Sequence, residues 1–411
     1  MNRWLLGLVL LLALLVAGAP VALAGTSPVA VPPVSTQGSP PPGPATPNAV
    51  APSPDSVLQQ LDLRDLNTTL NQLNQTWKGY GPEVSLTEFL QIYKGGGTPW
   101  SFTSIVSGLL RYLGRELVAN AQLLIKLIVI AVLAALLQQM NSAFTTETTG
   151  KAAQGVIYLV MVGMAVTGFG LAVSIAKQVM DSLVTFMIAM LPTLLTILAG
   201  MGGVTSAAIF HPLMVTLTSA AATLILTVYF PLIFLSAVLE IISGLSDYKL
   251  TKLGALFSDW AKKVLTFTFV VFGATVAVKG AAGAVADGLT MKTAKFVFKN
   301  FIPVVGNAFA DSTDLIFGST LMLKNALGLM GAATIFFIAI FPLLKILALT
   351  WVYQLAGALV QPIGADPIAK LLTALAKALH AVFGAVGAVT LMFLVALTVI
   401  VGAGNIALMV R

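Results

Sequence analysis

The sequence contains no cysteine, only two histidines and few charged residues. The absence of cysteine excludes disulfides, thiolate zinc sites, iron–sulfur clusters and a cysteine nucleophile. Charged residues make up 9% of the 411 residues, whereas a soluble domain typically carries about 25%. The chain therefore cannot cover a water-facing surface of ordinary size.

Long apolar runs take the place of the missing charge. The chain is 58% hydrophobic with a mean hydropathy of +0.96, and a helix needs roughly 20 apolar residues to cross a bilayer. We predict an all-α polytopic membrane bundle of about six to eight spans, at about residues 117–140, 153–176, 181–200, 213–243, 264–286, 326–353 and 380–404, with a weaker segment near 294–310.

The N-terminus has the three parts of a secretory signal peptide. Arg3 precedes an apolar run from Trp4 to Val16, and a small-residue site follows at Ala22-Leu23-Ala24. We predict a signal peptide over 1–24; an uncleaved N-terminal anchor is the alternative. The Pro-rich stretch 25–54 buries too little apolar surface to offset its ordering entropy, so it is expected to be a disordered linker.

An amphipathic pattern marks the region 55–116, which we expect to be helical and extracytoplasmic. Its apolar residues recur at 3-4-3-4 spacing and form one narrow stripe, made of Leu63, Leu66, Leu70, Leu73 and Trp77. This stripe either packs on the protein's own helices, around 86–93 and 102–117, or docks a partner outside the membrane.

The membrane domain, 117–411, contains an internal repeat at an offset of 111 residues, with halves at about 153–245 and 264–356. Ala221-Ala222-Thr223 recurs as Ala332-Ala333-Thr334, and Phe230-Pro231-Leu232 recurs as Phe341-Pro342-Leu343. The candidate helix breaks are Pro192, Pro231, Pro303 and Pro342. Paired broken helices indicate a central pathway in transporters, whereas isolated prolines merely kink helices; both interpretations remain.

The distribution of lysines bears on both partner and topology. The formal net charge is +7, but the lysines lie singly between apolar runs, which suits membrane lipid headgroups better than nucleic acid. By the positive-inside rule, we expect the loop 249–263 to be cytoplasmic, which requires 181–200 or 294–310 to be re-entrant.

Catalytic and cofactor motifs are missing from the sequence. His211 and His380 lie 169 residues apart without acidic neighbours at ligand spacing, and a metal site normally needs three or four ligands. Gly150-Lys151 lacks the rest of a phosphate loop, and Gly168-Phe169-Gly170 lacks the rest of a dinucleotide site. We predict a protein that is not an enzyme and binds no cofactor or metal.

Charged residues inside apolar runs are the candidate functional residues, because each is costly at the bilayer centre. Glu240 and Lys279 lie on adjacent predicted spans and could pair. A polar stretch follows from 287 to 324, with Asp287, Lys295, Lys299, Asp311, Asp314 and Lys324 as candidates for a polar path. Asp311 and Asp314 would share a helical face; alternatively, Asp311 or Ser312 caps the helix that follows.

Several stretches in register resemble the stage III sporulation protein AE family of endospore-forming bacteria. They run in order over about residues 100–411: Gly202-Gly203 through Ser206-Ala207-Ala208 to Phe210-His211-Pro212, Pro231 to Ala237, Gly280-Ala281 through Ala286-Asp287-Gly288, Thr293 to Phe296, Asn300 to Val304, Leu323-Lys324-Asn325, Gln361 to Gly364, and Ala403-Gly404-Asn405.

The resemblance implies a sporulation role. It implies a polytopic subunit of a secretion-like channel complex between mother cell and forespore, located in the mother-cell membrane, with a separate ATPase chain among its partners. It supplies no catalytic residue. Two rival functions are an autonomous secondary transporter and a non-conducting assembly scaffold.

Overall fold

The computed structural model describes residues 64–76, 84–85, 87–89, 101–144, 147–245, 250–301, 305–364 and 366–409. All of these belong to one compact unit, Val50–Arg411. The predicted signal peptide and linker lie outside the described residues, as do Leu63 and Trp77 of the amphipathic stripe.

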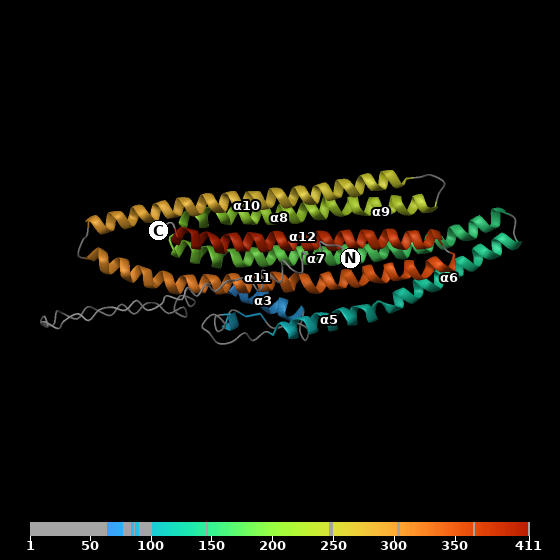
Figure 1. The fold of residues 1–411 in the computed structure, drawn as a ribbon, viewed down its shortest axis with the longest axis horizontal. Helices are drawn as coiled ribbons and strands as arrows, with labels where there is room; N and C mark the ends of the chain where they lie inside the picture. The colour runs from blue at the N-terminus through green and yellow to red at the C-terminus, as the bar shows by residue number, and fades with distance from the viewer. Residues whose placement is uncertain are drawn as a thin grey trace, which may run out of the picture. The chain divides into compact units, whose positions relative to one another are not determined.

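Every element in the described part of the chain is helical, as predicted. An apolar chain without water has to satisfy its backbone groups internally, and helices do this within one segment. The elements are α3 (Arg64–Thr76), α5 (Phe102–Ala119), α6 (Ala121–Phe144), α7 (Glu147–Gly200), α8 (Val204–Leu224), the π-helical turn η1 (Ile225–Tyr229), α9 (Phe230–Leu245), α10 (Thr251–Phe301), α11 (Val305–Val360), the 3-10 turn η2 (Gln361–Ile363) and α12 (Asp366–Met409) (Figure 1).

The last helix, α12, lies at the centre of the bundle. It contacts α7, α8, α9, α10 and α11, and Figure 1 shows it between α10 and α11. Its buried side chains recur every three or four residues, as at Leu379, Val382 and Val386, and continue through Val389 and Phe393. The core is therefore built around α12, with α10 and α11 on either side of it.

Six helical segments are long and apolar enough to cross a membrane, among the residues described. They are Thr103–Leu136, Val162–Gly200, Val204–Ser243, Thr251–Leu289, Thr320–Ile363 and Asp366–Ala403. This number falls in the predicted range. The segments predicted at 153–176 and 181–200 are not two spans, because both lie in the single helix α7.

Several of these helices are longer than a bilayer is thick. The 54 residues of α7 correspond to about 80 Å of helix, against a hydrocarbon core of about 30 Å. The helices α10, with 51 residues, and α11, with 56, are similar. Each of them therefore extends beyond the hydrocarbon on at least one side.

Prolines do not break these helices where the sequence pattern places breaks. Pro192 lies inside α7 and Pro342 inside α11, so both predicted breaks are wrong. Pro231 follows the π-helical turn η1, in which the chain widens without stopping. Pro303 lies outside the described residues, between the end of α10 and the start of α11.

The amphipathic helix α3 packs on its own chain. Leu66 and Leu70 are buried, and α3 contacts α7. Asn74 holds the next segment through both of its side-chain atoms: Nδ2 donates to the Val84 carbonyl at 3.0 Å, and Oδ1 accepts the Val84 N–H at 2.9 Å. Of the two interpretations of the stripe, intramolecular packing accounts for the described leucines.

Candidate functional site

A buried carboxylate connects two helices at the α7–α8 turn. The N–H of Thr205 donates to Asp287 Oδ1 at 2.8 Å, and the N–H of Ser206 donates to Oδ2 at 2.9 Å. These are orphan donors of the first turn of α8, where the N-cap residue, Gly203, has no side chain to offer. Asp287 of α10 therefore caps α8 from 81 residues away, and each of its two oxygens accepts one hydrogen bond from the helix N-terminus.

Small residues let α10 approach α8 closely enough for this bond. A Cβ added at Gly283 would lie 2.8 Å from Ser206 Oγ and 3.2 Å from its Cα, and one at Gly280 would lie 3.3 Å from the Phe210 ring. The hydroxyl of Ser206 is buried and has no hydrogen-bond partner in the described part of the chain.

A second charged side chain, Lys324 of α11, is buried at the same level. A Cβ at Gly328 of α11 would meet Val401 of α12, and one at Gly280 of α10 would meet Val399. Gly328 of α11 and Gly280 of α10 therefore lie beside the same turn of α12, on opposite sides of it. From that turn, Lys324 lies four residues along α11 and Asp287 seven residues along α10, both in the direction of the α7–α8 turn. Their exposed fractions are only 1% each. We call Asp287, Lys324, Thr205 and Ser206 the polar layer.

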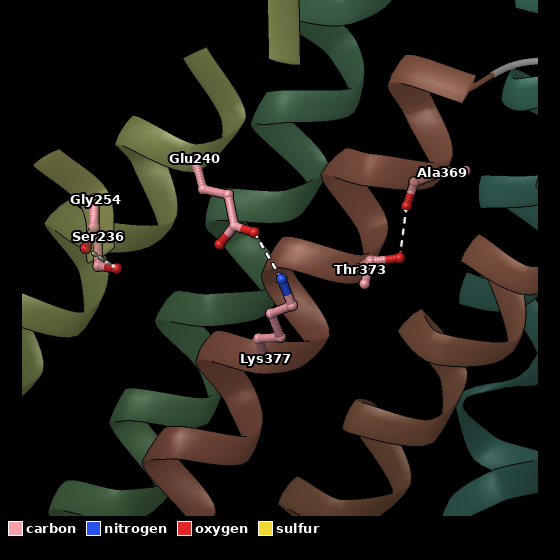
Figure 2. Close-up of polar contacts among 6 residues, drawn as sticks. All are labelled: Ser236, Glu240, Gly254, Ala369, Thr373 and Lys377. Atoms are coloured by element: carbon pink, nitrogen blue, oxygen red, sulfur yellow. Dashed lines mark hydrogen bonds and ion pairs between the residues drawn. The ribbon is translucent and has the colours of Figure 1, made fainter. Parts of the chain in front are cut away.

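Glu240 pairs with Lys377, not with Lys279. Lys377 Nζ of α12 donates to Glu240 Oε1 of α9 at 2.8 Å (Figure 2). Beside it, Ser236 Oγ donates to the Gly254 carbonyl at 2.8 Å, which fixes the register of α9 on α10. Lys279 lies 25 residues beyond Gly254, about 37 Å along α10, and is exposed. The predicted pairing is therefore wrong.

Sequence reasoning missed Lys377 because its partner is 137 residues away. The available signal was a stripe of polar positions on α12, since Asp366, Lys370, Thr373 and Lys377 are all exposed and recur at three- and four-residue spacing. Figure 2 shows Thr373 and Lys377 on successive turns, with Thr373 Oγ1 bonded to the Ala369 carbonyl.

The remaining predicted path residues lie on helices, but their side chains are outside the described set. Lys295 and Lys299 are in the last turns of α10, and Asp311 and Asp314 are in α11. Since α11 begins at Val305, six residues before Asp311, neither Asp311 nor Ser312 is its N-cap, and that prediction is wrong. Among the described residues, no group of three potential metal ligands occurs.

These observations define the protein as a multi-pass helical membrane protein whose bundle holds buried charges at one end. The sequence profile of the family Stage III sporulation protein AE matches residues 84–404. The chain is also 37% identical over 345 residues to "Stage III sporulation protein AE" of Bacillus subtilis (strain 168), covering 83% of this chain and 86% of that protein. The chain belongs to this family. No solved structure matches it.

Proposed function

We propose that this chain is the polytopic, non-enzymatic subunit of a secretion-like channel complex between mother cell and forespore. The polar layer is the observation that carries the proposal. Burying Asp287 and Lys324 in an apolar bundle is costly, and ionisable residues in membrane spans usually mark a transport path or a relay. In this proposal the 287–324 region lines the path, and Lys324 is the side chain that meets it.

The proposed setting follows from family membership and from the six spans. The signal peptide is cleaved and leaves 55–116 outside the cytoplasm. Six crossings then place the connections 246–249 and 361–365 in the cytoplasm, near Lys252, Lys262, Lys263, Lys370 and Lys377, in agreement with the positive-inside rule. The membrane is that of the mother cell, and energy comes from a separate ATPase chain, which agrees with the missing phosphate loop in this sequence.

The structure weakens the sequence argument for an autonomous transporter. That argument needs broken helices at corresponding places in the two repeat halves. Pro192 in the first half and Pro342 in the second both lie inside continuous helices, α7 and α11. The described prolines therefore do not break their helices, and we favour the channel subunit over the autonomous transporter.

Replacing Lys324 by methionine tests the function. Methionine keeps most of the apolar stem and removes the charge, so we expect a strong loss of spore formation with normal protein level in the membrane. The matched control is Lys279→Met, which removes an exposed lysine from the neighbouring span and should leave sporulation intact. Copurification of the other complex subunits should be unchanged in both variants.

Two outcomes would contradict the proposal. Normal sporulation with Lys324→Met would mean that the charge of Lys324 in the polar layer is not needed for function. Loss of subunit copurification together with sporulation would favour the scaffold. Independently, single cysteines placed through 287–324 should react with a water-soluble maleimide at some positions, and uniform lack of reaction would exclude an aqueous path there.

A further inference from the structure

Residues 251–263, at the start of α10, carry an exposed surface that is both basic and aromatic. Lys252, Lys262 and Lys263 are exposed there, together with Leu253, Leu256 and Trp260. Asp259 is the one acidic residue of the segment and pairs with Lys262 at 3.0 Å. The ring of Phe257 packs edge-on against Trp260, with centroids 5.9 Å apart. We call the three exposed lysines together with Leu253, Leu256 and Trp260 the basic–aromatic surface.

The helical positions divide this surface into two flanks. Gly254 and Ala261 face inward and are buried. At 100° per residue, Lys252 and Lys263 fall opposite them, while Leu253, Leu256 and Trp260 fall on one adjacent flank. Lysines beside tryptophan and leucine on one helical segment are typical of a helix at the lipid headgroup level.

The exposed face of α10 changes character at Lys263. The next 15 residues, 264–278, contain no charged residue, which is about 22 Å of helix. The large exposed side chains in this stretch are apolar, among them Phe267, Val270 and Val278. One helix thus passes from a basic–aromatic surface to an uncharged and mainly apolar one, as expected where it enters hydrocarbon.

We propose that the basic–aromatic surface binds the headgroups of anionic phospholipids. The lysine ammonium groups pair with lipid phosphates, Trp260 sits at the boundary of headgroup and acyl chain, and Leu253 and Leu256 contact the chains. Lys252 and Lys263 form no ion pair among the described residues, so their charges are available. A soluble acidic partner fits less well, because exposed leucines and the apolar stretch beyond Lys263 adjoin the lysines.

Tryptophan quenching by brominated lipid tests this site directly in the full chain. The chain has five tryptophans, so Trp4, Trp77, Trp100 and Trp351 are replaced by phenylalanine to leave Trp260 alone. The purified protein is reconstituted in phosphatidylcholine vesicles containing equal mole fractions of dibrominated phosphatidylglycerol or dibrominated phosphatidylcholine. We expect stronger quenching by the anionic lipid, weakened in about 1 M NaCl, where the Debye length is about 3 Å.

The matched control is the variant that keeps Trp351 alone. Trp351 of α11 is similarly exposed but has no lysine or arginine within four residues, so it should be quenched equally by both lipids. Changing Lys252, Lys262 and Lys263 together to glutamate should abolish the preference at Trp260, since each lysine near an anionic surface strengthens binding about fivefold. Trp351 quenching in that background reports whether the protein still inserts.

Three results would overturn the inference. Equal quenching of Trp260 by both lipids would mean lipid contact without headgroup recognition. Quenching of Trp260 by aqueous iodide, with none by either lipid, would mean that the surface faces water and serves a soluble partner. Loss of the preference on adding inorganic phosphate would mean that free phosphate, not a lipid, is the ligand.

Discussion

Asp287 shows how a membrane bundle accommodates a charged residue. Its two oxygens accept the N–H groups of Thr205 and Ser206, so the carboxylate replaces the capping side chain that Gly203 lacks. Sequence reasoning selected Asp287 and Lys324 as unusual, because charge in an apolar run is visible without a structure. The donors that satisfy Asp287 were not predictable, since they are backbone groups about 80 residues away.

Replacing Asp287 by alanine should destabilise the bundle. Two hydrogen bonds to a buried charged group are lost and the α8 donors are left unpaired, which corresponds to about 2–4 kcal/mol. Asp287→Asn should cost less, since asparagine also caps helices. Unfolding in detergent, followed by far-ultraviolet circular dichroism, measures both.

The control for this prediction is Asp259→Ala, which removes an exposed aspartate from the same helix. Its ion pair with Lys262 is largely solvated, so stability should change by less than about 0.5 kcal/mol. Equal unfolding midpoints for Asp287→Ala and Asp259→Ala would refute the capping role.

The exposed pair of Glu240 and Lys377 should contribute little to stability. The side chains are 38% and 65% exposed respectively, and pairs of this kind contribute about 0.2–1 kcal/mol. A double-mutant cycle of Glu240→Gln and Lys377→Met should therefore give a coupling energy at the low end of that range. A larger coupling, of several kcal/mol, would mean that the pair is shielded from water in the membrane.

At the scale of elements, close packing of helices decides which glycines matter. A Cβ at Gly168 of α7 would collide with the hydroxyl of Tyr353, a buried residue of α11. A Cβ at Gly163, five residues earlier on the same helix, would meet nothing within 4 Å. The sequence shows both glycines in one apolar run and does not separate them, since the difference depends on where Tyr353 of another helix packs.

Alanine at these two glycines should have opposite effects. Gly168→Ala forces α7 away from Tyr353, so we expect destabilisation of about 1–3 kcal/mol. Gly163→Ala should be neutral or stabilising by up to about 1 kcal/mol, because alanine is the better helix former. Thermal unfolding in detergent provides the comparison, and a destabilising Gly163→Ala beside a neutral Gly168→Ala would contradict the α7–α11 packing.

The sequence predicted the helical class of each element better than its ends. The apolar runs and the apolar stripe of α3 predicted helices correctly, because their spacing reflects which side chains are buried. Prolines misled the prediction at Pro192 and Pro342, since a helix supported by neighbours on several sides tolerates the missing N–H. The same support explains why two predicted spans are one helix, α7.

At the scale of the whole molecule, the six candidate spans give a simple arrangement of the bundle's two ends across the membrane. Six crossings put the α7–α8 turn and the η2 connection on opposite sides of the membrane, because three spans separate them. The cytoplasmic placement of the lysine-rich connection was a prediction from charge alone. In the structure it requires no re-entrant segment, because 181–200 belongs to α7.

Cysteine labelling at the two ends of the bundle tests the membrane-spanning account most directly, because the chain has no cysteine of its own. Val204 begins α8 and Gln361 begins η2, and both are exposed. With Val204→Cys, a membrane-impermeant maleimide should label intact protoplasts; with Gln361→Cys, it should label only after permeabilisation. Labelling of both positions in intact protoplasts, or of both only after permeabilisation, would contradict the six-span bundle.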